Sequence, residues 1–124
     1  MSAVIDHVSL AVRDLTAGTV FYEQALSALG FELVYRETEY VTFGLNDNGD
    51  FAIHQANKRV GGAHIAFPAS NREHVERFWG AALAAGATPV RAPGTHPDYG
   101  RGSFAAFVRD RDGNNIEAVY RAPV

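Results

Sequence analysis

The chain has 124 residues, of which 47% are hydrophobic and 20% charged, with no cysteine and a formal net charge of −3. This composition fits one globular domain, excludes disulfides and thiolate chemistry, and gives no charged surface for nucleic acid or an anionic membrane. Because there is no signal-peptide pattern and no apolar run near the roughly 18 residues of a membrane span, we expect a soluble, cytoplasmic protein.

The first half of the chain predicts a helix among short strands. The segment "IDHVSLAV" alternates and is rich in β-branched residues, which indicates a strand. Helical spacing then runs from about Thr16 to Leu29, and Gly30 ends that helix. Three further strands follow as "FELVYRE", "YVTFGL" and "FAIHQA". We expect the helix to bury Phe21, Tyr22, Ala25, Leu26 and Leu29.

The second half predicts the same β-α-β-β-β order. The strand "AHIAF" precedes a helix that a capping box from Ser70 to Glu73 opens and Gly86 ends. Strands near "TPVRA", "SFAAFVR" and "NNIEAVY" complete this half. Its helix is expected to expose His74 and to bury Val75, Phe78, Trp79, Ala82 and Leu83.

The two halves align as an internal repeat, with modules over residues 1–57 and 61–124 of a single domain. An offset of 57 places His7 on His64 (64 − 7 = 57). Near the other end, "NDNGDFAIHQ" corresponds to "DRDGNNIEAV", which makes either Ile53 or His54 the counterpart of Glu117. Strand alternation favours His54, because Phe51 and Ile53 are the natural core residues of that strand.

The same alternation predicts a shared site. If the apolar positions of each strand face the helices, His7, His54, His64 and Glu117 all point into one concavity. A lone histidine in an apolar strand is more often a satisfied core residue than a ligand, but the repeat-related positions favour a ligand role. Two imidazoles and one carboxylate on rigid strands suit divalent Zn, Ni, Fe or Mn and leave open coordination positions.

The sequence resembles the vicinal oxygen chelate superfamily, which contains glyoxalase I, extradiol dioxygenases, fosfomycin-resistance enzymes and bleomycin-resistance proteins. The resemblance is carried by "IDHVSLAVRDL", "AHIAF" and "SFAAFVRDRDGNNIEAV". It implies an α+β fold of two paired β-α-β-β-β modules that form a curved mixed-sheet cleft, and a homodimer. It also implies a divalent metal ion held by His7, His64 and Glu117. Histidine at position 54 departs from the glyoxalase I pattern, so His54 is left open as a fourth ligand, a base or a pocket wall.

The segment "RAPGTHPDYGRGS" is either a lid, with Tyr99 or Arg101 contacting a small-molecule substrate, or a solvated turn.

We expect a metal-dependent glyoxalase-like enzyme, a lyase or isomerase, in which the metal polarises a small oxygen-chelating substrate. By analogy with glyoxalase I, Glu117 is the first candidate for the catalytic base and His54 is the second. The alternatives are an Fe(II) extradiol-type dioxygenase and a non-catalytic binding protein of the bleomycin-resistance type.

Overall fold

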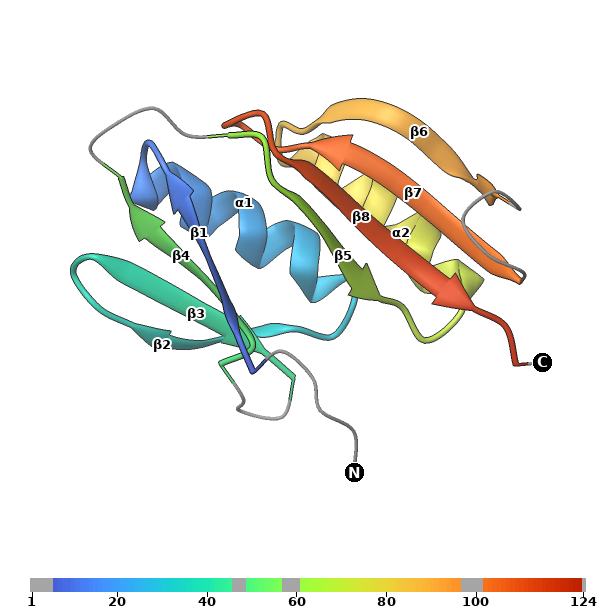
Figure 1. Ribbon diagram of the computed structural model, residues 1–124, viewed down its shortest axis with the longest axis horizontal. Coiled ribbons are helices and arrows are strands. Elements are labelled where there is room, and N and C mark those ends of the chain that lie inside the picture. Colours follow the sequence, from blue (N-terminus) through green and yellow to red (C-terminus); the bar gives the residue numbers. More distant parts are fainter. Residues whose placement is uncertain (1–5, 46–48, 57–60, 97–101, 124) are drawn as a thin grey trace.

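The chain folds into the two predicted β-α-β-β-β modules in a computed structural model that describes residues 6–45, 49–56, 61–96 and 102–123 (Figure 1). The first module contains β1 (Val8–Val12), α1 (Leu15–Ser27), β2 (Glu32–Arg36), β3 (Tyr40–Gly44) and β4 (Phe51–Gln55). The second contains β5 (His64–Pro68), α2 (Arg72–Ala84), β6 (Thr88–Thr95), β7 (Ser103–Arg109) and β8 (Asn115–Arg121). The predicted fold class, α+β, is confirmed.

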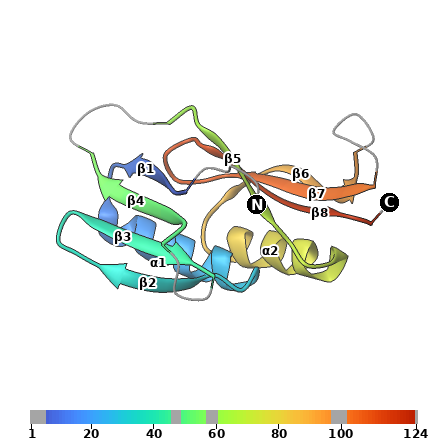
Figure 2. The same ribbon diagram turned by 60° about the horizontal axis from the view of Figure 1, so that its bottom comes forward.

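Each module forms one four-stranded mixed sheet. The strand orders are β1-β4-β3-β2 and β5-β8-β7-β6, so the two sheets repeat the same topology. The first strand of each module pairs parallel with the last, and the remaining pairs are antiparallel. Both helices lie on the same side of the two sheets (Figure 2). Neither helix therefore covers the opposite faces of the sheets.

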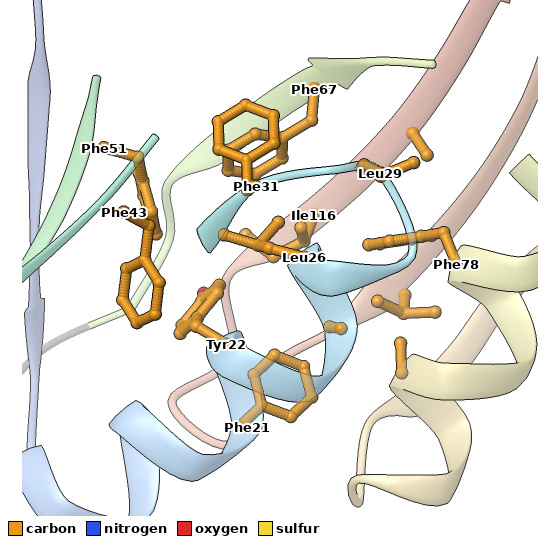
Figure 3. Close-up of a cluster of buried hydrophobic side chains, with 14 of the residues drawn as sticks. Phe21, Tyr22, Leu26, Leu29, Phe31, Phe43, Phe51, Phe67, Phe78 and Ile116 are labelled. Carbon is orange, nitrogen blue, oxygen red and sulfur yellow. The ribbon is translucent and has the colours of Figure 1, made fainter. Parts of the chain in front are cut away.

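The two modules share one hydrophobic core between the sheets and the helices (Figure 3). The Phe67 ring on β5 packs edge-on against two rings of the first module, Phe31 at 5.3 Å and Phe51 at 5.1 Å between centroids. All five residues predicted on the buried face of the first helix are buried. On α2, Val75, Phe78 and Ala82 are buried, whereas Trp79 and Leu83 are partly buried against the core.

The start of α2 differs by one residue from the prediction. Asn71, rather than Ser70, is the N-cap: its backbone is extended (φ −162°, ψ 176°) and its side-chain oxygen accepts a hydrogen bond from His74 N at 2.9 Å. Asn ranks with Ser among the best N-cap residues, so composition alone does not separate two adjacent candidates. Glu73 lies in the first turn, where a carboxylate is favourable to the helix dipole.

Two further predictions in the second module are wrong. His74 is half-buried rather than at the solvated surface, and its Nδ1 is buried without a hydrogen-bond partner among the described residues. The residues from Pro93 to Thr95, which follow the predicted strand "TPVRA" and were predicted to be a lid or a turn, belong to β6. Pro93 is tolerated there because β6 is an edge strand and its pairing with β7 shifts register between Arg91 and Gly94.

A buried polar network joins the first module to the turn before β8. The Asp110 carboxylate accepts hydrogen bonds from Tyr22 Oη at 2.5 Å, from the backbone N–H groups of Asp112 and Asn114, and from Asn114 Nδ2. Asp112 Oδ1 accepts from Arg13 N and Nε. Burial, together with the neighbouring Asp110 charge, raises the pKa of Tyr22 well above its usual 10.0, so this hydroxyl stays a donor.

Candidate metal centre

His64 and Glu117 meet on the sheet face that carries no helix. Strands β5 and β8 run parallel, with His64 paired to Asn115 and Ala66 paired to Glu117. His64 Nε2 lies 2.9 Å from Glu117 Oε1. The Glu117 side chain is 9% exposed and the His64 side chain 54% exposed. The pair is therefore a nearly buried carboxylate beside an imidazole that solvent can reach.

Strand alternation, as predicted, explains why these two side chains share a face. In β8, Ile116 and Ala118 belong to the core, so Glu117 between them points to the other side. In β5, Phe67 is buried in the core, whereas His64 and Ala66 are exposed. In β1, Leu10 and Val12 are buried and Ser9 is exposed.

His7 does not join this pair within one chain. It immediately precedes β1, its Nδ1 lies 2.8 Å from Asp6 Oδ1, and its side chain is 63% exposed. Strands β1 and β5 run in opposite directions (Figure 1), so the start of β1 lies beside the later part of β5, where His7 and Pro68 line one cavity, and away from His64 at the start of β5. Across the described residues, no three His, Asp or Glu side chains gather closely enough to hold a metal ion.

The strand register corrects the counterpart of Glu117. Under the repeat, Ser9 is equivalent to Ala66 (66 − 57 = 9), and Ser9 pairs with Ala52 whereas Ala66 pairs with Glu117. Ala52, and neither Ile53 nor His54, therefore occupies the position of Glu117. Alternation permits Ala52 and His54 equally, because they are two residues apart and share a face. The register decides between them.

His54 lies on the uncovered face of the first sheet. It pairs with Ala11 on β1 and with Tyr40 on β3. Its Nδ1 lies 2.7 Å from Ser9 Oγ, which fixes the orientation of the ring. His54 therefore shares a face of the first sheet with Ser9, but within the described residues of one chain it does not join Glu117 in a metal-binding cluster.

Phe107, beside His64, and Arg91, beside Phe107, were not predicted as site residues, whereas His96 belongs to the segment predicted to be a lid or a turn. The Phe107 ring on β7 lies 6.1 Å from the His64 ring and 5.7 Å from the His96 ring, and Arg91 Cζ lies 6.0 Å from its centroid. His96 is buried and donates its Nε2–H to Ala105 O at 3.2 Å. Side chains alternate along the strand "SFAAFVR", so the face to which Phe107 points can be predicted as soon as the face of one neighbouring residue is known. The predicted substrate residues Tyr99 and Arg101 lie outside the described residues.

A cavity of about 310 Å³ lies where the two modules meet. Its lining includes His7 and Asp50 from the first module and Ala66 and Pro68 from β5. The aromatic rings of Phe31, Phe51 and Phe67 also contribute to it. Its lining does not include His64 or Glu117, although it does include Ala66, which pairs with Glu117.

The ligand atoms of the His64–Glu117 pair are of the types that bind a divalent metal ion. An imidazole nitrogen and a carboxylate oxygen come from neighbouring rigid strands, and such ligands suit Zn, Ni, Fe or Mn. Asn115, paired with His64, has its Oδ1 buried with no hydrogen-bond partner among the described residues. Since a buried carboxylate is costly without a positive partner, a cation beside Glu117 would offset that cost. One chain supplies two of the three predicted ligands at this point.

Comparison with known proteins gives a consistent result. A family model for the "Glyoxalase/Bleomycin resistance protein/Dioxygenase superfamily" matches residues 4–118. A glyoxalase/bleomycin resistance protein from Albidiferax ferrireducens T118 is 28% identical, with a TM-score of 0.83 over 94% of this chain and 98% of that one. None of the curated proteins matches the chain significantly in sequence.

Two less similar solved structures share the fold. A glyoxalase-related enzyme from Fulvimarina pelagi is 21% identical, with a TM-score of 0.74 over 94% of this chain and 87% of that one. A glyoxalase/bleomycin resistance protein/dioxygenase family enzyme from Burkholderia phytofirmans PsJN is 19% identical, with a TM-score of 0.73 over 97% of this chain and 100% of that one.

Within the described residues, neither helix has the length and apolar character needed to span a membrane.

Proposed function

Because the chain belongs to the Glyoxalase/Bleomycin resistance protein/Dioxygenase superfamily, we propose that it is a metal-dependent, glyoxalase-like enzyme acting on a small oxygen-chelating substrate. The observation that carries this proposal is the contact of 2.9 Å between His64 Nε2 and Glu117 Oε1 on an uncovered sheet face. The 28% identical relative, whose name joins glyoxalase and bleomycin resistance protein, supports the same class of protein.

The proposed metal ligands are His64 and Glu117 of one chain and His7 of a second copy. His7 is exposed and lies away from the pair within its own chain. A homodimer in which the first sheet of one copy faces the second sheet of the other would bring the three together. The open edges of β1 and β5 favour such an association, because unpaired edge strands are normally covered.

The bound metal would act as a Lewis acid that stabilises negative charge developing on a substrate oxygen. The protein's own contribution is to orient the substrate and to move a proton. Glu117 is the first candidate for the base, since it lies beside the proposed chelation site, and a base must come within about 3 Å of the proton that it removes. His54 is the second candidate, because Ser9 holds its Nδ1 and an imidazole suits proton transfer near neutral pH.

The donor set also supports a second candidate function, a ring-cleaving dioxygenase that uses Fe(II). Two histidines and one carboxylate form the ligand triad of non-haem Fe(II) oxygenases, with positions left open for oxygen and substrate. In both candidates, Tyr99 and Arg101 are proposed to contact the substrate. A non-catalytic binding protein of the bleomycin-resistance type is the third outcome that experiment can reveal.

Metal content tests the site. Protein purified without chelator is expected to hold one divalent ion per chain, and His7→Ala, His64→Ala and Glu117→Gln are each expected to lose it. His54→Ala is the matched control, a histidine on an uncovered sheet face whose loss should lower turnover but keep the metal. The metal should also dissociate as the pH falls through about 6.5, where free imidazole becomes protonated. Unchanged metal content in His64→Ala and Glu117→Gln would refute the ligand assignment.

Turnover tests the reaction. Protein loaded with Zn, Ni, Fe or Mn is offered 2-oxoaldehyde thiol adducts, catechols and epoxides. Isomerisation of a thiol adduct supports the glyoxalase-like reaction, and oxygen consumption with catechol and Fe(II) supports the dioxygenase. Tight binding of a small molecule without turnover would contradict both enzyme proposals and support the non-catalytic binding protein.

A further inference from the structure

Ser9 and His54 are neighbours on the uncovered face of the first sheet. Ser9 Oγ lies 2.7 Å from His54 Nδ1, although the two residues are 45 positions apart in the sequence. Ser9 is exposed and His54 is half-buried, so a small molecule can reach the hydroxyl. A serine hydroxyl within about 2.6–3.2 Å of an imidazole nitrogen is the arrangement in which a general base activates a nucleophile.

The strand pairing holds both side chains in place. Strands β1 and β4 run parallel, with Ser9 opposite Ala52. His54 lies two residues further along β4, opposite Ala11, so it is the diagonal neighbour of Ser9 on the same face. Ala52 and Ala11 carry only methyl groups, so neither side chain separates the hydroxyl from the imidazole. When the imidazole proton is on Nε2, Nδ1 accepts the hydrogen bond that the Ser9 hydroxyl donates.

Two exposed tyrosines lie on the same face beside His54. Tyr40 pairs directly with His54, and Tyr35 pairs with Thr42, so both tyrosine side chains point to the uncovered side. Their ring centroids are 6.2 Å apart, and Tyr35 and Tyr40 are 50% and 39% exposed. These rings therefore offer an accessible surface on which an aromatic substrate can stack.

From this arrangement we propose that Ser9 is a nucleophile that accepts the acyl group of neutral aryl esters, with His54 as its base. Ser9 Oγ attacks the ester carbonyl carbon while its proton passes to His54 Nδ1. The bond between that carbon and the aryl oxygen then breaks, and the phenol leaves with the proton that His54 returns. Water hydrolyses the acyl-serine to a carboxylic acid and restores Ser9. No metal ion takes part, so this activity lies beyond the proposed metal-dependent function.

The size and charge of this face agree with such a substrate. Ser9 on β1 and Tyr40 on β3 are two strands apart, and neighbouring strands are about 4.8 Å apart, so the two backbones are separated by roughly 10 Å. An aryl ester covers this distance with its carbonyl at Ser9 and its ring on Tyr40. The rows of paired residues through Ser9 and through His54 contain no Lys, Arg, Asp or Glu, so they offer a charged substrate no ionic partner.

Reaction of the chelator-treated protein with 4-nitrophenyl acetate tests the proposal. We expect a rapid release of one 4-nitrophenol per chain followed by slower turnover, the kinetic sign of an acyl-enzyme that accumulates. Peptide mass spectrometry should find the acetyl group on Ser9. Because the metal has been removed, failure of the proposed metal site would leave this result unchanged, and failure of this test would leave the metal site standing.

Three variants assign the roles. Ser9→Ala should abolish both the rapid release and the acetyl adduct. His54→Gln should slow acylation by about a hundred-fold or more, which is the usual contribution of a general base. Tyr40→Leu should raise KM by about two- to ten-fold with little change in the maximal rate, because only stacking is lost. Ser27→Ala is the matched control, since the Ser27 hydroxyl donates to Gln24 O and not to a histidine.

Each role has an outcome that would overturn it. Acetylation of other residues only, or a rapid release that persists in Ser9→Ala, would show that Ser9 is not the nucleophile. An unchanged acylation rate in His54→Gln would exclude His54 as the base. An unchanged KM in Tyr40→Leu would contradict the assignment of aryl esters as the substrate class.

Discussion

Ala52 occupies, in the first module, the place that Glu117 occupies in the second. Each lies opposite the equivalent residue of its neighbouring parallel strand, Ser9 for Ala52 and Ala66 for Glu117. Both are nearly buried, at 7% exposure. The repeat is therefore asymmetric where the chemistry is expected: the second module has a carboxylate and the first has a methyl group.

Ala52→Glu is expected to strengthen metal binding. If His7 and residue 52 of one copy face His64 and Glu117 of the other, the new carboxylate supplies a fourth ligand of a type that divalent metals accept. We expect the dissociation constant for Zn(II), measured by competition with a chelator, to fall by about ten-fold or more. Ala11→Glu is the control, since Ala11 shares this face but pairs with His54. Equal effects of both variants would contradict the proposed facing of the sheets.

Mixing two metal-free variants should restore metal binding. A dimer of His7→Ala with His64→Ala chains contains one site with both histidines intact and one with neither. After random exchange half of the dimers are mixed, so about one quarter of the wild-type metal content should return. Elemental analysis before and after mixing measures this. No recovery, with exchange verified by mass spectrometry, would show that each site is built within one chain or in a different dimer.

Tyr22→Phe should destabilise the protein at neutral pH and change its alkaline behaviour. The substitution removes one of the hydrogen bonds to buried Asp110, at a cost of about 1–2 kcal/mol in the free energy of unfolding. The raised pKa of Tyr22 means that its stabilising contribution is complete below about pH 10, where the unfolded tyrosine keeps its proton, and is lost as the pH rises further toward the folded pKa.

Urea unfolding at about pH 8 and about pH 11 measures both effects. The stability lost by the wild-type protein between these two conditions should be smaller in Tyr22→Phe. Tyr40→Phe is the control, because Tyr40 is 39% exposed and its hydroxyl makes no hydrogen bond among the described residues. The same alkaline loss in wild type and Tyr22→Phe would mean that Tyr22 does not titrate differently on folding.

Substitutions at two adjacent residues test which of them is the N-cap of α2. Asn71→Ala removes the acceptor for His74 N and should cost about 1 kcal/mol, whereas Ser70→Ala should cost close to nothing. The midpoints of thermal unfolding of the two variants decide between them. A larger loss in Ser70→Ala would restore the capping box that the sequence predicts.

The sequence by itself determined the order of the elements and the face on which each side chain lies. Both follow from local periodicity. The helical spacing of apolar residues from Phe21 to Leu29 predicts which face of the first helix is buried, and strand alternation predicts that Glu117 points away from the core. The repeat then predicts two similar modules, because equal patterns bury equal faces. No knowledge of distant contacts is needed for these conclusions.

Only the tertiary structure decided which of the predicted site residues meet. Alternation has a period of two, so it permits Ala52 and His54 equally as the mate of Glu117, and the inter-strand register alone selects Ala52. The separation of His7 from His64 depends on how the two modules pack through their shared core, which is a non-local property. The contact between Ser9 and His54 likewise exists only because hydrogen bonding between strands brings distant segments side by side.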